Sequence, residues 1–281
     1  MCFMTPQSGW SRHQGTIWAI LAALVAAWQG PRVVTLLQPE PSVVPDFFQE
    51  WSSARAYFAG DPIYGSLPGA ARRYLGVELP ATDIQAEYNL HPPTSVLLTL
   101  PLGLLDFRVA CLFWNLLSLL ALVVTLWLVW HAKKHCSRAW ILLPVGVYLF
   151  TCFPLRVHLY WVQLNLILGL LLAGAWTADR RDRPAWSGIL TALATALKLF
   201  PGFVFLYFLA RQRWRALIGG AITLGALNAA ALLLFGWQAF DDYVHRATRE
   251  VTPIFISLWF NESLPGFWAK LLGGGRDYGT V

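Results

Sequence analysis

FRVACLFWNLLSLLALVVTLWLVW, residues 107–130, decides the fold class of this chain. The run contains a single charge, Arg108, and is long enough to cross the roughly 30 Å hydrocarbon core of a bilayer as a helix. It ends at the basic segment His131-Ala132-Lys133-Lys134-His135, and basic residues beside an apolar run are typical of the cytoplasmic side of a membrane. The sequence therefore predicts a membrane protein whose residue 130 lies near the inner face.

The composition of the whole chain agrees with this prediction. Hydrophobic residues make up 57% of the 281 residues, charged residues only 13%, and the mean hydropathy is +0.51. The net charge of +6 comes from short basic clusters between apolar runs, which favours membrane orientation over a nucleic-acid partner. The cysteines (Cys2, Cys111, Cys136 and Cys152) form no CxxC pair, and we interpret them as thiols rather than as metal ligands or disulfides. P-loop, HExxH and GxSxG motifs are absent from the sequence, so neither a metal nor another cofactor is predicted.

We predict one all-α domain over residues 1–281, with about seven membrane segments, an inner N-terminus and an outer C-terminus. Residues 17–37 form the first span, in which Gly30-Pro31-Arg32 predicts a kink or an interfacial second half. Residues 38–106 form an outer loop with short helices, residues 107–235 hold the remaining spans, and residues 236–281 form an outer tail. The segments predicted after residue 91 are the short apolar helix Pro92–Leu105, the span 107–130, the runs Ala139–Phe153 and His158–Trp176 joined by a tight turn at Pro154–Val157, a hairpin of two short helices within Trp186–Ala210, and the span Ala216–Phe235.

The hairpin within residues 186–210 is predicted from the positions of basic residues. Basic clusters, Arg180–Arg183 and Arg211–Arg215, flank both ends of 186–210, and one span cannot place both of its ends inside. Lys198 and Pro201 lie in the middle of the run, so we predict that they occupy the outward tip. A cation at membrane depth is a functional candidate by default, and Lys198 would be satisfied by a lipid phosphate or by an acid such as Asp46.

Asp46 is the leading catalytic candidate. It follows the first span in Pro45-Asp46-Phe47-Phe48, and an acid between apolar residues at the membrane boundary is suited to accept a proton. The alternative is a helix N-cap, a common role of Asp. Glu50 comes one turn later and would share its helix face, which indicates either an acid–base pair of carboxylates or simply a solvated face.

Further polar residues cluster near the predicted outer boundary. His91 precedes Pro92-Pro93, a rigid helix start, and is either a hydrogen-bonding ligand or an interfacial histidine. Arg156 and His158 are followed by Gln163 and Asn165, and polar groups at the end of a span are costly unless they face a cavity. Snorkelling of the side chain to the surface is the alternative for Arg156.

Taken in order, several short motifs resemble those of glycosyltransferase family 87, in the GT-C superfamily, over roughly residues 10–272. They are Asp46 with Tyr57-x-Ala59-Gly60 and Pro62-x-Tyr64, His91-Pro92-Pro93 with Leu97-Leu98 and Pro101-Leu102, Gln163-x-Asn165 with Leu170, Ala196-Leu197-Lys198-x-x-Pro201 with Tyr207 and Arg211-x-Arg213-Trp214, and Asn261-x-Ser263-Leu264-x-Gly266. The chain departs from the family pattern where His91 replaces tyrosine, Val162 replaces glycine and Glu262 replaces glutamine. The helices expected after the core are missing.

The resemblance implies a GT-C-like membrane enzyme that transfers a hexose, usually mannose, from a polyprenyl-phosphate donor. The acceptor would be a hydroxyl of a glycan or glycolipid, the anomeric centre would be inverted, and transfer would occur on the periplasmic face of the bacterial inner membrane without a metal. Asp46 would be the catalytic carboxyl group. The residues expected to bind donor phosphate or substrate are Lys198, Arg156, His158, Gln163, Asn165, His91, Tyr57, Tyr64 and Asn261, with the Arg72-Arg73 pair as a further source of positive charge.

This reading depends on Asp46 and Lys198 meeting around one anionic headgroup. The alternatives are a flippase or transporter for a lipid-linked sugar, a structural membrane subunit, and a truncated, inactive homologue. A transporter is expected to have paired halves and binding groups near the bilayer midplane, whereas here the polar groups gather at the outer boundary, which favours chemistry there.

Overall fold

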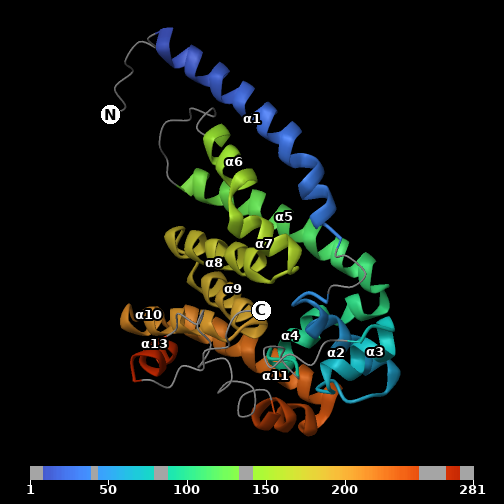
Figure 1. Ribbon diagram of the computed structural model, residues 1–281. Helices are drawn as coiled ribbons and strands as arrows, with labels where there is room; N and C mark the ends of the chain where they lie inside the picture. Colours follow the sequence, from blue (N-terminus) through green and yellow to red (C-terminus); the bar gives the residue numbers. More distant parts are fainter. Residues whose placement is uncertain (1–8, 39–43, 79–87, 133–141, 247–263, 273–281) are drawn as a thin grey trace. The chain divides into compact units, whose positions relative to one another are not determined.

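The computed structural model describes residues 9–38, 44–78, 88–132, 142–246 and 264–272 (Figure 1). Within these ranges the only regular elements are helices. Three of them are long and apolar enough to cross a membrane, His13–Leu36, Phe107–His131 and Trp214–Arg246, and a bent pair raises the number of candidate spans to four. The predicted all-α membrane protein is confirmed at this level, and the count of seven segments stays a prediction.

The described chain divides into two compact units, the first formed by Met1–Phe47 and Arg108–Arg181, the second by Phe48–Phe107 and Asp182–Val281. The first unit holds α1 (Gly9–Leu36), nearly all of α5 (Phe107–Ala132), α6 (Leu142–Thr151), α7 (Phe153–Tyr160) and α8 (Asn165–Arg180). The second holds α2 (Phe48–Ala59), α3 (Leu67–Leu75), α4 (Pro93–Thr99), η1 (Leu100–Leu104), α9 (Pro184–Leu197), η3 (Phe200–Phe203), α10 (Val204–Ala210), α11 (Trp214–Asp242) and α13 (Leu264–Leu271).

In the first unit, α1 packs against α6 and α7. The helix continues through Pro31, so the predicted interruption at Gly30-Pro31-Arg32 does not end it. Asn115 of α5 is fully buried and donates hydrogen bonds to the carbonyls of Leu36 and Leu37 at the end of α1, at 3.3 and 3.1 Å, and to that of Leu159 in α7, at 3.0 Å. One side chain therefore satisfies the carbonyls that two helix ends leave without partners.

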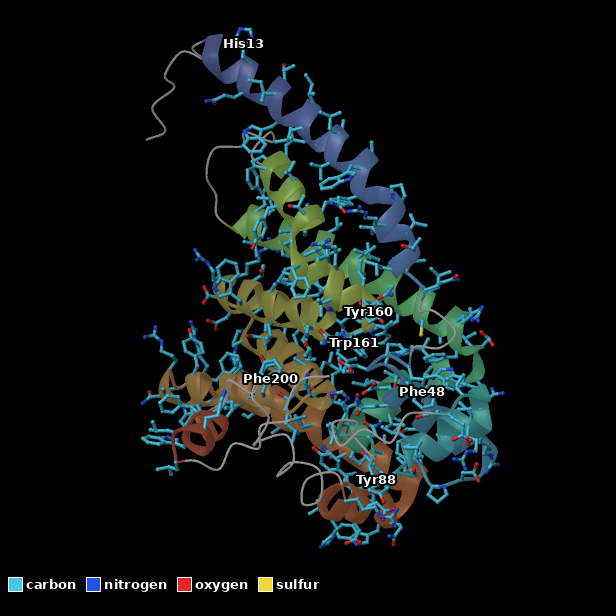
Figure 2. All side chains as sticks on the ribbon, viewed as in Figure 1. His13, Phe48, Tyr88, Tyr160, Trp161 and Phe200 are labelled. Atoms are coloured by element: carbon cyan, nitrogen blue, oxygen red, sulfur yellow. The ribbon has the colours of Figure 1, made fainter. Side chains whose placement is uncertain are left out.

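The predicted tight turn at Pro154–Val157 is wrong, because these residues lie in α7. Pro154 is the second residue of that helix, where proline is well tolerated since its missing N–H would have had no partner within the helix. The chain bends instead between α7 and α8, whose axes differ by 114°. Figure 2 labels Tyr160, the last residue of α7, and Trp161, which follows it. The rings of these two residues meet edge to face with centroids 5.3 Å apart.

In the second unit, α2 packs against α3, α4 and η1. The indole of Trp51 donates to the carbonyl of Leu105 at 3.1 Å, and Arg55 donates to that of Gly103 at 3.1 Å. Gly103 lies so close to α2 that a Cβ there would be 2.7 Å from the carbonyl carbon of Ala54. Glycine is therefore needed where η1 crosses α2.

Helix α9 packs closely against α11 through small residues. A Cβ at Gly188 would lie 1.9 Å from the carbonyl oxygen of Ala216, and one at Gly219 would lie 2.9 Å from that of Ala185. Small residues that let two backbones approach are the usual means of packing helices in membranes, where no hydrophobic force draws them together. Helix α11 then kinks at Gly236, which has a φ of 76°, and continues to Asp242 instead of ending at Phe235.

The predicted break around Lys198 is confirmed. Helix α9 ends at Leu197, Lys198 is extended with φ −154° and ψ 130°, and the short helices η3 and α10 follow. Both of these pack against α9. Pro201 lies in the first turn of η3, where a proline favours a new helix start.

Candidate functional site

The backbone around Asp46 is held from both sides. Asp46 itself is exposed, whereas Pro45 before it and Phe47 after it are buried. The ring of Phe47 stacks on the indole of Trp114 in α5, with centroids 5.0 Å apart. Helix α2 begins at Phe48, so Asp46 stands two residues ahead of it. An exposed carboxyl group is thus presented on a backbone whose neighbours are anchored in the first unit.

Two amide side chains extend from the α7–α8 break to this carboxylate. Gln163 donates its Nε2 to Oδ2 of Asp46 at 3.1 Å, and Asn165 donates its Nδ2 to Oε1 of Gln163 at 2.9 Å. The Gln163 backbone is fixed as well, because its N–H donates to the carbonyl of His158 at 3.0 Å and its carbonyl accepts from Nε1 of Trp114 at 3.3 Å. Asp46, which the sequence analysis named apart from Gln163 and Asn165, is therefore linked to them in one hydrogen-bonded chain.

The break that carries Gln163 contains a strained residue. Val162 is fully buried and has a φ of 50°, a left-handed conformation that is rare for β-branched residues. Such a conformation costs roughly 1–2 kcal/mol in a residue other than glycine. This is the position where the sequence has valine in place of the glycine of the family motif, so the chain keeps the bend without the residue that would form it most easily.

Helix α7 contributes two polar groups whose nitrogens are buried. Arg156 Nε and His158 Nε2 have no hydrogen-bond partner among the residues that the structure describes, and His158 is only 5% exposed. Buried polar atoms normally bind something, and a water or a ligand is the usual explanation when the protein offers nothing. Both residues were predicted to bind substrate, and that role stays a prediction.

Lys198 belongs to the second unit, whereas Asp46 belongs to the first, and their predicted meeting around one headgroup stays a prediction. Within the described residues, the ammonium of Lys198 has no ion-pair or hydrogen-bond partner. It follows the C-terminus of α9, where the helix dipole favours a positive charge. Apolar side chains that are more than half exposed follow it, namely Leu199, Phe200 and Phe203.

The aromatic residues predicted to bind substrate lie in the core of the second unit. Tyr64 is fully buried and its hydroxyl donates to the carbonyl of His91 at 2.6 Å. Burial raises the pKa of this hydroxyl well above its usual value. Tyr57 packs edge to face on Phe235 with ring centroids 5.3 Å apart. The hydrogen bond from Tyr64 supports the loop that carries His91.

The interpretation of Glu50 as part of a solvated face is wrong, and so is the helix face that it was expected to share with Asp46, whereas a catalytic role for it stays a prediction. Glu50 is fully buried rather than solvated, and it shares no helix face with Asp46 because α2 begins after that residue. Its Oε1 contacts Nδ1 of His91, and its Oε2 is buried without a hydrogen-bond partner among the residues that the structure describes. The two residues are 41 positions apart, and no local sequence signal could have paired them.

The remaining predicted cations already have carboxylate partners. Arg72 pairs with Glu78 at 2.7 Å, and Arg73 pairs with Asp61 at 3.0 Å, so they are less available to a phosphate than the sequence suggested. Asn261 lies outside the described residues. In the described ranges no group of three or more His, Cys, Asp or Glu is arranged to hold a metal ion.

Comparison with known proteins adds the following. The model of glycosyltransferase family 87 matches residues 89–280. A polyprenol-phosphate-mannose-dependent alpha-(1-2)-phosphatidylinositol pentamannoside mannosyltransferase of Mycolicibacterium smegmatis is 29% identical over 201 residues, covering 68% of this chain and 46% of that protein. A polyprenol-phosphate-mannose-dependent alpha-(1-2)-phosphatidylinositol mannoside mannosyltransferase of Mycobacterium tuberculosis is 25% identical over 269 residues, covering 87% of this chain and 58% of that protein. The chain spans about half the length of the curated relatives it matches. No solved structure matches it.

Proposed function

This chain belongs to glycosyltransferase family 87, and we propose that it is a membrane enzyme that transfers a hexose from a polyprenyl-phosphate donor to a glycolipid or glycan hydroxyl. The names of its relatives support mannose as the sugar and a phosphatidylinositol mannoside as the acceptor. One structural observation carries the proposal, namely the exposed carboxylate of Asp46 held by the amide of Gln163.

Asp46 acts as the general base in this proposal. The acceptor hydroxyl gives its proton to the carboxylate while its oxygen attacks the anomeric carbon from the face opposite the phosphate. The bond between that carbon and the phosphate oxygen breaks, its electron pair stays on the phosphate, and the anomeric centre is inverted. Gln163 orients the carboxylate through Oδ2, and Asn165 orients Gln163.

Cations stabilise the leaving group. A phosphate diester already carries one negative charge and gains another as the sugar departs, so a fixed positive charge favours the transition state over the ground state. Lys198 supplies this charge in our proposal, because it is a cation without a partner among the described residues, next to exposed apolar side chains suited to a lipid tail. Arg156, whose Nε lacks a partner in the described chain, contributes within the first unit.

The direction of α8 supports chemistry on the outer face. Its C-terminal end carries Arg180, followed by Arg181 and Arg183, and clustered basic residues mark the cytoplasmic side. Its N-terminal residue is Asn165, which lies two positions after Gln163. If α8 crosses the membrane in this direction, Gln163 and the Asp46 carboxylate that it binds would lie at the periplasmic side, which supports the proposal.

The test is transfer by the purified chain in lipid nanodiscs, with radiolabelled polyprenyl-phosphate-mannose and phosphatidylinositol mannoside. Asp46→Asn is expected to lower transfer by roughly 10²–10⁴-fold, with donor binding largely intact. Asp182→Asn is the matched control, because Asp182 is highly exposed and has a φ of 52°, a conformation that asparagine adopts readily. Full turnover by Asp46→Asn would refute the role. Movement of the donor across the bilayer without any transfer would favour a flippase instead.

A further inference from the structure

Arginines gather at one end of the second unit, away from the residues proposed to act in transfer. They lie in the turns that lead into α9 and α11, and we call the following four residues the arginine cluster: Arg183, Arg211, Arg213 and Arg215. Arg213 is half-buried, and the other three are exposed. Because α9 has 14 residues, about 21 Å separate its start at this cluster from Lys198 at its other end.

The two turns lie side by side. Nη1 of Arg213 is 3.9 Å from Oδ1 of Asp182, so the turn before α11 reaches the turn before α9. The helices that follow pack together (Figure 1), and a Cβ on Gly188 near the start of α9 would meet the backbone of Ala216 near the start of α11. The arginine cluster therefore forms one surface.

Helix stability does not explain arginine at these positions. Arg183 and Arg213 are the N-cap residues of α9 and α11, and neither helix has a side-chain hydrogen bond at its cap. The preferred N-cap residues are Ser, Thr, Asp and Asn, and the helix dipole makes a positive charge unfavourable at this end. An anion bound at the cluster would relieve this repulsion at both helices.

Little of the positive charge is neutralised by the protein itself. Among the residues that the structure describes, the guanidinium groups of Arg183, Arg211 and Arg215 have no ion-pair or hydrogen-bond partner. Arg213 has Asp182, whose own side chain is 89% exposed. The cluster thus keeps a clear excess of positive charge, which is complementary to an anionic partner.

The surroundings of the cluster are those of a membrane surface. Helix α11 belongs to the candidate span Trp214–Arg246, so the cluster stands where that span begins. Trp186 and Trp214, in the first turns of α9 and α11, are both 58% exposed. Tryptophan favours the boundary between hydrocarbon and headgroups. Exposed indoles beside guanidinium groups fit a phospholipid, because it offers an acyl chain and a phosphate together.

We propose that the arginine cluster binds the headgroup of an anionic phospholipid in the leaflet around the start of α11, with Trp186 and Trp214 against its glycerol and upper acyl chains. Guanidinium groups form paired, charge-assisted hydrogen bonds with phosphate oxygens. The bound lipid fixes the starts of α9 and α11 at the membrane surface. This site is independent of the proposed transfer, and it stands or falls without any sugar donor.

Lipid retention by the detergent-purified chain, measured by native mass spectrometry, tests the site. With equal amounts of phosphatidylglycerol and phosphatidylcholine that carry identical acyl chains, wild type should retain phosphatidylglycerol preferentially. Arg211→Gln/Arg215→Gln should raise the Kd for phosphatidylglycerol roughly 25-fold, since each arginine near anionic lipid is worth about a factor of five. Arg246→Gln is the control, because it removes the same charge at the other end of the span, and it should retain lipid as wild type does.

Two further arms separate lipid binding from other roles of the charge. A detergent micelle has no inner or outer side, so a loss of retention there cannot come from reversed membrane orientation. Arg211→Lys/Arg215→Lys keeps the charge without the planar fork, and its Kd should lie between those of wild type and the glutamine variant. Equal retention of both lipids by wild type, or wild-type affinity in the glutamine variant, overturns the proposal. Competition by glycerol phosphate at similar concentration would assign the cluster to soluble phosphates and overturn it as well.

Discussion

The indole of Trp114 stacks on the ring of Phe47, with the two ring planes only 20° apart. The same indole donates its Nε1–H to the carbonyl of Gln163 at 3.3 Å. One side chain of α5 thus fixes the segment that carries Asp46 and the break that carries its amide partner. The position of the Asp46 carboxylate is therefore set by packing against α5 inside the first unit, and not only by the segment that carries Asp46.

Gln163→Leu removes the amide but keeps a side chain of similar size. Because the Asp46 carboxylate then loses the N–H group that orients it, kcat should fall by roughly tenfold to a hundredfold, while the Kd for the polyprenyl-phosphate sugar donor stays unchanged. Steady-state transfer assays measure kcat, and equilibrium binding of the radiolabelled sugar donor measures Kd. Asn228→Leu, a similar loss of an amide at an exposed position of α11, should leave both quantities as in wild type. Unchanged kcat in Gln163→Leu would show that Asp46 does not depend on this contact.

Gly188→Ala and Gly225→Ala should change stability in opposite directions. A Cβ at Gly188 would meet the backbone of Ala216, so α9 and α11 must move apart, at a cost of about 1–3 kcal/mol. Gly225 is also helical but has open space around it, and alanine there should raise the free energy of unfolding by about 0.5–1 kcal/mol. Unfolding in a fixed detergent compares the two variants. Equal effects would mean that the close helix contact is not present.

Tyr64 should make the second unit sensitive to alkali. Burial raises the pKa of its hydroxyl well above the usual value, so the folded chain holds this proton more tightly than the unfolded chain. The resulting stabilisation is complete below a pH of about 10 and is lost as the pH rises beyond it. Tyr64→Phe should be about 1 kcal/mol less stable at pH 8, because the hydrogen bond to His91 is lost, and should lose less stability than wild type between pH 8 and 11. Parallel losses in the two proteins over that range would contradict the buried hydroxyl.

Apolar length and proline position were sufficient to predict several elements. The run 107–130 became α5, Phe107–Ala132, because a long apolar stretch with a single charge near its start favours a helix in a membrane. The break at Lys198 was predictable because charges at both ends of the run excluded a single span. At Pro154 the sequence predicted a turn, but the residue lies in the first turn of α7. Proline is common in both settings, so the local sequence could not distinguish them.

The site was less accessible to sequence reasoning because its contacts are distant along the chain. Asp46 and Gln163 are 117 positions apart, and only the family resemblance placed them in one reaction. Glu50 looked like a surface residue because helix periodicity cannot show which face a neighbouring loop will cover. Its partner, His91, comes from beyond a segment whose course no local pattern determines.

The length of α8 has a consequence for how deep the reaction takes place. Its 16 residues span about 24 Å, which is less than the roughly 30 Å thickness of a bilayer's hydrocarbon layer. In the proposed orientation, with its basic end at the cytoplasmic surface, even an upright α8 would leave Asn165 several ångströms below the opposite surface. In the proposed transfer, sugar headgroups would then have to descend to meet the chain, and the thickness of the surrounding lipid would help to determine which acceptors can reach it.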